Sequence, residues 1–290
     1  MTNPKHPTKP SAAPNSLRGT IKTRFSSLKR SASGDTANTV RTTPHKGIYL
    51  LPNSFTLAAL FCGFYAIVQA MNNHFETAAI AIFCSLILDG MDGRIARMTN
   101  TQSAFGEQFD SLADMVSFGV APALIMYEWT LKGLGKWGWL AAFIYVAGAA
   151  MRLARFNTNI KVVDKRFFQG MPSPAAGALM AGFVWLAVDL RLPIKQSYLQ
   201  WTAFALTVYA GVTMVSNAPF WSGKSLAIKQ SVPFWALGLV ALAFVAVSSD
   251  PPVVLFGLFV VYGISGYVLW AWRLIKRPKS ALAAAQTDSK

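Results

Sequence analysis

Charged residues, cysteine and histidine are all scarce in this sequence. Only 13% of its 290 residues are charged, whereas soluble chains average about a quarter, so an ordinary soluble domain is excluded. The two cysteines, Cys62 and Cys84, lie in apolar runs without the spacing of metal ligands, and we expect no disulfide. The three histidines, His6, His45 and His74, fall in tails or a loop, which argues against Ser–His catalysis and histidine-bound metal.

Acidic residues are also few, and the net charge is +15. The basic residues flank apolar stretches, so we attribute them to anionic lipid headgroups and membrane orientation and expect no nucleic-acid partner. Residues 1–46 contain nine Lys or Arg and a single acid, Asp35. We interpret this segment as a disordered basic cytoplasmic tail, and residues 275–290 as a C-terminal cytoplasmic tail.

Long apolar runs make up most of the rest, and many approach the ~20 residues that span a bilayer. They lie near 48–71, 76–96, 108–128, 138–157, 173–190, 199–218, 232–248 and 253–272. We therefore predict an all-α fold, a polytopic membrane helical bundle of about eight transmembrane helices within residues 47–274. Strongly basic connections alternate with weakly charged ones, which places both termini in the cytoplasm by the positive-inside rule.

An unusual share of the acids is concentrated in one stretch, since five of the twelve fall between Asp89 and Asp114. Asp89 and Asp92 are three residues apart and Asp110 and Asp114 four apart, so on helices each pair shares a face. A short loop joins the two segments, which predicts a hairpin whose acidic faces meet. Such a group needs neutralisation, either by protons, as in a transport pathway, or by hard cations such as Mg²⁺, Mn²⁺ or Ca²⁺.

The residues between the two acidic pairs favour the metal interpretation. Gly93 lets a ligand approach the helix backbone, and Ala96 leaves room beside it. Arg97 adds a cation suited to a phosphate oxygen. Paired metal ions are a known device for phosphoryl transfer, so the stretch is typical of a nucleotide diphosphate site.

The stretch from Asp89 to Asp114 fills the pattern D-x2-D-G-x2-A-R-x8-G-x3-D-x3-D. This resembles the signature of the CDP-alcohol phosphatidyltransferases, membrane enzymes that move a phosphatidyl group from a CDP-linked lipid to an alcohol and release CMP. We expect two bound divalent ions, Mg²⁺ or Mn²⁺, and an active site that faces the cytoplasm from the inner membrane, because the acidic pairs lie on the strongly basic side. The resemblance also implies a homodimer. It assigns metal binding to Asp89, Asp92, Asp110 and Asp114, with Asp114 also taking the proton from the attacking hydroxyl. The CDP site would be lined by Gly93, Ala96, Arg97 and Gly106.

Three further stretches resemble the phosphatidylserine synthase branch of that family. The first, around Leu51–Thr56, offers Asn53 and Thr56 on one helix face as ligands of the nucleotide or a phosphate, although Asn53 also suits a helix cap. The second continues from Asp110 to Pro122. The third contains Arg152, Arg155 and Asn157, which we predict to bind the serine carboxylate or the lipid phosphates, with membrane anchoring as the alternative for either arginine.

The sequence therefore predicts a transferase that makes phosphatidylserine and CMP from CDP-diacylglycerol and L-serine. Two alternatives stay open. In the first, the enzyme uses another acceptor alcohol, such as glycerol phosphate, inositol phosphate or choline. In the second, the protein is a cation or proton transporter that uses the same carboxylates. The transporter gives no reason for Gly93, Ala96 and Arg97 at their spacings.

Overall fold

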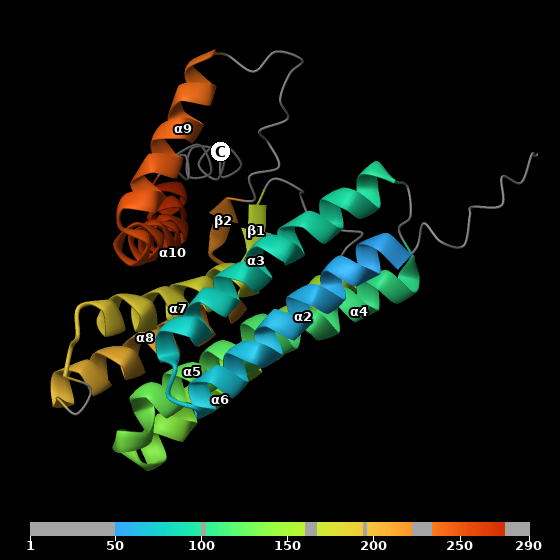
Figure 1. Cartoon of the computed structure of the whole chain (residues 1–290). Coiled ribbons are helices and arrows are strands. Elements are labelled where there is room, and N and C mark those ends of the chain that lie inside the picture. Colours follow the sequence, from blue (N-terminus) through green and yellow to red (C-terminus); the bar gives the residue numbers. More distant parts are fainter. Residues whose placement is uncertain (1–49, 100–102, 160–166, 194–195, 222–233, 276–290) are drawn as a thin grey trace, which may run out of the picture. The chain divides into compact units, whose positions relative to one another are not determined.

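The computed structural model describes residues 50–99, 103–159, 167–193, 196–221 and 234–275, whose elements are labelled in Figure 1. The α-helices are α2 (Leu50–Met71), α3 (Phe75–Met98), α4 (Ala104–Asp114), α5 (Ala121–Trp129), α6 (Lys136–Asn159), α7 (Ser173–Asp189), α8 (Ser197–Val215), α9 (Phe234–Ser249) and α10 (Pro251–Ile275). A π-helix, η1 (Met115–Val120), joins α4 to α5, and a 3₁₀ turn, η2 (Leu131–Leu134), precedes α6. Two strands are present, β1 (Phe167–Gln169) and β2 (Pro219–Trp221).

The prediction of a helical membrane protein is confirmed. Because α4, η1 and α5 form one continuous span, the described residues contain eight helical segments, each at a predicted position. Of these, four are long and apolar enough to cross a membrane: Pro52–Met71, Ala104–Trp129, Lys136–Thr158 and Pro251–Trp272. The predicted tail at 1–46 lies outside the described residues, and so does the one at 275–290 except for Ile275, the last residue of α10. The domain boundaries and the cytoplasmic location of both termini therefore stay predictions.

An antiparallel strand pair is one element that the sequence analysis did not predict. Phe167 in β1 lies opposite Trp221 in β2, and Gln169 lies opposite Pro219. Each strand has only three residues, too few for the alternation by which a strand is recognised in a sequence. The pair stands where the chain enters α7 and leaves α8, so it connects the ends of these two helices.

One backbone carbonyl of α2 accepts hydrogen bonds from two neighbouring segments. The Ala59 oxygen accepts a hydrogen bond of 2.8 Å from Ser85 Oγ of α3 and one of 3.2 Å from Ser117 Oγ of η1. Gly63, one turn further along α2, permits this approach, because a Cβ there would lie 2.7 Å from Ser117 Cα. The first helical hairpin and the π-helix are therefore fixed to each other near the middle of the bundle.

The interior is built mainly from small residues, and many large apolar side chains point outward. Ala66, Ala78 and Ala149 are fully buried, whereas Val261 and Phe244 are 69% and 74% exposed. In water this distribution would be unfavourable, but lipid is as apolar as the core. Helices in a bilayer instead associate through small residues that let their backbones approach.

A close approach of this kind occurs between α6 and α8. Gly148 of α6 faces Gly211 of α8, and a Cβ on Gly148 would overlap the Gly211 carbonyl, whose carbon would lie 3.0 Å away. A Cβ on Gly211 would in turn lie 2.9 Å from the Tyr145 Cα. A side chain at Gly148 or Gly211 would therefore force the two helices apart.

We expect Gly148→Ala to lower stability by about 1–3 kcal/mol, because the new methyl group overpacks the contact between α6 and α8. The matched control is Gly257→Ala in α10, where a Cβ would meet nothing within 4 Å and the better helix former should leave stability unchanged or raise it by up to ~1 kcal/mol. Thermal unfolding in detergent, followed by tryptophan fluorescence, measures both. Equal melting temperatures for the two variants would contradict the crossing as described.

Candidate active site

The C-terminal half of α3 and the C-terminal half of α4 bring the two acidic pairs together. Asp89 and Asp92 lie in the last turns of α3, and Asp110 and Asp114 lie in α4. Helix α4 begins at the N-cap residue Ser103, whose Oγ accepts a hydrogen bond of 3.0 Å from Gly106 N. The acids of the two helices thus face one another, as predicted, while residues 100–102, which join the helices, lie outside the described residues.

The carboxylates are close enough to share a ligand. Oxygens of Asp89, Asp92 and Asp110 all lie within 4.8 Å of one another. Asp114 completes the group, since its carboxylate comes within hydrogen-bonding reach of Asp89, as Asp110 does of Asp92. Asp92 is only 6% exposed, so these charges are partly withdrawn from water and repel one another at full ionisation.

A divalent cation fits this arrangement. Asp110 Oδ1 is buried and accepts no hydrogen bond, although a buried carboxylate oxygen normally has a partner. No cationic side chain replaces it, because within the described ranges the ion pairs of 4.0 Å or less are limited to Lys132–Glu128, far from the cluster in the sequence. An all-carboxylate set is the ligand type that hard cations such as Mg²⁺ and Mn²⁺ prefer.

A hydroxyl group from α2 orients one of the carboxylates. Thr56 is 5% exposed, and its Oγ1 donates a hydrogen bond of 2.8 Å to Asp92 Oδ2. The carbonyl of Pro52 lies 3.3 Å from the same hydroxyl. This contact fixes the rotamer of Asp92 and leaves its other oxygen to face the cluster, which is the usual role of groups behind metal ligands.

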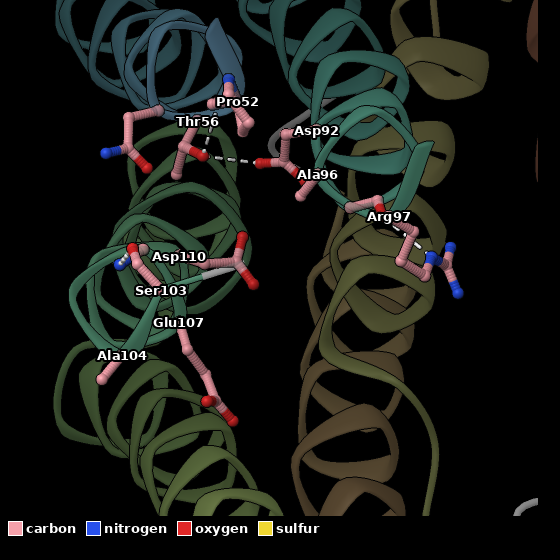
Figure 2. Close-up of a pocket in the computed structure, with 12 residues that line it drawn as sticks. Pro52, Thr56, Asp92, Ala96, Arg97, Ser103, Ala104, Glu107 and Asp110 are labelled. Atoms are coloured by element: carbon pink, nitrogen blue, oxygen red, sulfur yellow. Dashed lines mark hydrogen bonds between the residues drawn. The ribbon is translucent and has the colours of Figure 1, made fainter. Parts of the chain in front are cut away.

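A pocket of about 550 Å³ opens beside the carboxylates, and Figure 2 shows Asp92 and Asp110 directed toward the space between their helices. Its lining includes all six residues predicted to bind the nucleotide: Asn53, Thr56, Gly93, Ala96, Arg97 and Gly106. No side chain obstructs the pocket at Gly93, where a Cβ would meet nothing within 4 Å. The volume and the mixed polar lining suit a nucleotide.

Arg97 borders this pocket but does not contact the carboxylates. Its Nε donates a hydrogen bond of 2.9 Å to the Gly93 carbonyl one turn earlier. In Figure 2 its guanidinium points away from Asp92. Among the described residues the Nη groups of Arg97 have no acceptor, so they stay available to an anionic ligand at the pocket rim.

Four further lining residues were missed by the sequence analysis: Pro52, Ser103, Ala104 and Glu107. Ser103 had a recognisable signal, since a serine before a helical segment is a common N-cap. Glu107 lies one turn before Asp110 and places a carboxylate in the pocket outside the three-member cluster. No feature of the sequence separated it from an ordinary surface glutamate.

The predicted acceptor residues divide into two groups. Arg152 Nη1 donates a hydrogen bond of 2.8 Å to Ser173 Oγ, and its charge lies near enough to Asp114 to interact with it. Arg155 and Asn157 are engaged elsewhere. Arg155 contacts Gln169 and Asn217, and Asn157 exchanges hydrogen bonds of 3.1–3.2 Å with Ser111.

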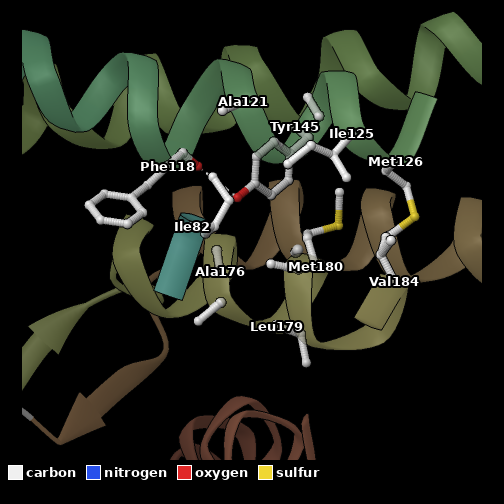
Figure 3. Close-up of a cluster of buried hydrophobic side chains, with 14 of the residues drawn as sticks. Ile82, Phe118, Ala121, Ile125, Met126, Tyr145, Ala176, Leu179, Met180 and Val184 are labelled. Atoms are coloured by element: carbon white, nitrogen blue, oxygen red, sulfur yellow. Dashed lines mark hydrogen bonds between the residues drawn. The ribbon is translucent and has the colours of Figure 1, made fainter. Parts of the chain in front are cut away.

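The π-helix after Asp114 has its own support. Pro122 has no N–H to offer the carbonyl of Phe118 four residues earlier. That carbonyl accepts a hydrogen bond of 2.8 Å from the hydroxyl of Tyr145, which is fully buried (Figure 3). The contact ties the span that carries Asp114 to α6, the helix that carries Arg152. π-turns inside α-helices are frequent at functional sites.

A sequence model described as CDP-alcohol phosphatidyltransferase matches residues 49–212, more than half of the chain. The chain belongs to the CDP-alcohol phosphatidyltransferase family. The match covers α2 to α8 and therefore every carboxylate and pocket residue described above. Because the family consists of transferases, membership argues against the alternative in which the protein is a cation or proton transporter.

Three curated relatives of this chain are named CDP-diacylglycerol–serine O-phosphatidyltransferase. The protein of that name from Helicobacter pylori is 37% identical over 234 residues, which is 80% of this chain and 96% of the relative. The one from Methanocaldococcus jannaschii is 33% identical over 64% of this chain and 82% of its own. The Mycobacterium leprae protein is 29% identical over 74% of this chain and 72% of its own.

We expect Asp110→Asn to weaken Mn²⁺ binding by about 10-fold or more, because the substitution removes one charged ligand from the cluster. Electron paramagnetic resonance of free Mn²⁺ during a titration measures the affinity. Asp189→Asn, at the exposed end of α7, is the control with the same change of charge. If the two variants bound Mn²⁺ equally well, the carboxylate cluster would not be the metal site.

Thr56→Val should weaken the same Mn²⁺ affinity by about 10–100-fold, because the methyl group that replaces the hydroxyl cannot orient Asp92. Thr56→Ser keeps the donor and should stay near the unmodified protein. The same titration compares the two variants. Weak binding by both would indicate that the size of the side chain matters rather than its hydrogen bond.

Proposed function

We propose that this chain transfers the phosphatidyl group of CDP-diacylglycerol to the hydroxyl of L-serine and releases CMP. The observation that carries the proposal is the carboxylate cluster beside a nucleotide-sized pocket, at the place where the family signature lies. The names of the relatives supply the substrates, since the Helicobacter pylori protein is called a CDP-diacylglycerol–serine O-phosphatidyltransferase and covers most of both chains.

The nucleotide binds in the pocket lined by α2, α3 and α4 in this proposal. Asn53 and Thr56 offer polar groups from α2, and Gly93, Ala96 and Gly106 leave room for the ligand. Arg97 at the rim contacts a phosphate oxygen. Asp89, Asp92 and Asp110, together with Asp114, hold two divalent ions, Mg²⁺ or Mn²⁺. When bound, these ions neutralise the diphosphate and the leaving CMP.

The reaction is a single displacement at the lipid-side phosphorus. Asp114 accepts the proton of the serine hydroxyl, and the serine oxygen forms a bond to the β-phosphorus. The bond between that phosphorus and the oxygen bridging to CMP breaks, and the electron pair leaves with CMP. Asp114 suits this role because it adjoins Asp89 on α3 and also lies within range of Arg152 on α6.

Serine is the acceptor that the surroundings of Asp114 support best. A phosphorylated alcohol would require several cations, whereas among the described residues no lysine or arginine lies within 4.0 Å of the Asp114 carboxylate, and the charge of Arg152 acts on it. Choline is a quaternary ammonium cation that an aromatic cage would favour, and the positive charge of Arg152, which acts on Asp114, would repel it. The guanidinium of Arg152 can bind the single carboxylate of L-serine through paired hydrogen bonds.

The diacyl tails of the donor require an active site that opens to lipid. The four candidate spans and their exposed apolar side chains supply that surface. We propose an inner-membrane location with the carboxylates and both termini on the cytoplasmic side, as the distribution of basic connections predicts. The homodimer implied by the family resemblance also stays a proposal.

Asp114→Asn should lower kcat by about 10²–10⁴-fold, because the amide cannot take the proton of the attacking hydroxyl. The assay measures CMP released by purified protein from CDP-diacylglycerol and labelled L-serine with Mn²⁺ or Mg²⁺. Asp189→Asn again serves as the charge-matched control. Full turnover by Asp114→Asn would show that another group is the base.

The same assay with a panel of acceptors tests the choice of substrate. We expect CMP release with L-serine and little with glycerol phosphate, inositol phosphate or choline. Preferred use of a phosphorylated acceptor would keep the family chemistry and overturn the proposal of serine.

A further inference from the structure

The two arginines near the end of α6 are held in different ways. Arg155 Nη2 donates to Gln169 Oε1 at 2.7 Å and to Asn217 Oδ1 at 2.5 Å, and its Nη1 donates to the Val215 carbonyl at 3.3 Å. These acceptors come from β1, from the segment between α8 and β2 and from the last residue of α8. Arg155 therefore ties the strand pair to α6, and most of its hydrogen-bonding capacity is used.

Arg152 is held at one point only. A guanidinium has five N–H groups, and in the part of the chain that the structure describes Arg152 uses one of them, for the 2.8 Å bond to Ser173 Oγ. No carboxylate lies within 4.0 Å of it, although the charge of Asp114 acts on it. A largely enclosed cation with four unused donors is prepared for an anionic ligand.

Ser173 is well placed to fix the direction of those donors. It is fully buried and is the first residue of α7, so its hydroxyl has a rigid support. Pro172 and Pro174 flank it and restrict the backbone on both sides. The first turn of a helix also carries unpaired N–H groups that favour negative charge nearby.

We propose that Ser173 is a positioning residue that orients Arg152 to bind the carboxylate of the acceptor amino acid. This inference rests on the proposed function and deepens it. Arg152 and Ser173 belong to α6 and α7, whereas the nucleotide pocket is lined from α2, α3 and α4. The charges of Asp89 on α3 and Arg152 on α6 both act on Asp114. In this proposal the substrate hydroxyl approaches Asp114 while the substrate carboxylate binds Arg152.

Ethanolamine provides the direct comparison, because it is serine without the carboxylate. If Ser173 acts through Arg152, Ser173→Ala should raise the KM for L-serine by about 10-fold, the usual effect of misplacing a charge-assisted hydrogen bond. The KM for CDP-diacylglycerol should change less than about 2-fold, and the preference for serine over ethanolamine in kcat/KM should fall by about 10-fold. Ser173→Thr retains the hydroxyl and should restore both values.

The control variant is Thr213→Val, which removes another buried hydroxyl contact, the 2.8 Å hydrogen bond between the hydroxyls of Thr213 on α8 and Tyr267 on α10. It should lower the melting temperature without changing the preference for serine. An unchanged KM for serine in Ser173→Ala, or an equal rise in both KM values, would overturn the role of Ser173 while the proposed function stands. Absence of CMP release from the unmodified protein with serine would overturn both.

Discussion

Repulsion among four carboxylates at one end of a helical hairpin is the constraint on which the rest of this structure depends. Asp89 and Asp92 are brought against Asp110 and Asp114 at a separation that charges of one sign oppose. The protein holds them there through contacts behind the cluster, where the Ala59 carbonyl joins three segments. The helices thus keep the carboxylates close together, and the repulsion among them favours the binding of cations. Those cations in turn attract a diphosphate.

The small interior residues are the means by which the helices hold that geometry. Gly63 lets η1 lie against α2, and Gly148 and Gly211 let α6 and α8 cross at backbone distance. Because each contact is between backbones, it has little freedom to relax. The position of Arg152 relative to Asp114 follows from these crossings, since Tyr145 on the same helix donates to the Phe118 carbonyl of η1.

Sequence patterns predicted the helices and the carboxylate cluster because both depend on local spacing. Apolar runs between polar connections marked the helical segments, and spacings of three and four placed the acids on common faces. The strand pair was too short to show a period. The difference between Arg152 and Arg155 was also out of reach, because it depends on Ser173, Gln169 and Asn217, which lie far along the chain from them.

The π-helix has a consequence for how this span can change. A π-turn accommodates one more residue than an α-turn, and each residue of an α-helix turns its side chain by about 100°. Residues Met115–Val120 therefore set the rotation of α4 relative to α5 about the helix axis. Helix α4 presents the acids to α3, and α5 packs against α7. Loss of one residue there would keep every reactive group in the sequence and turn the acids away from their partners. The number of residues in the π-helix is therefore as necessary for the active-site geometry as the aspartates themselves.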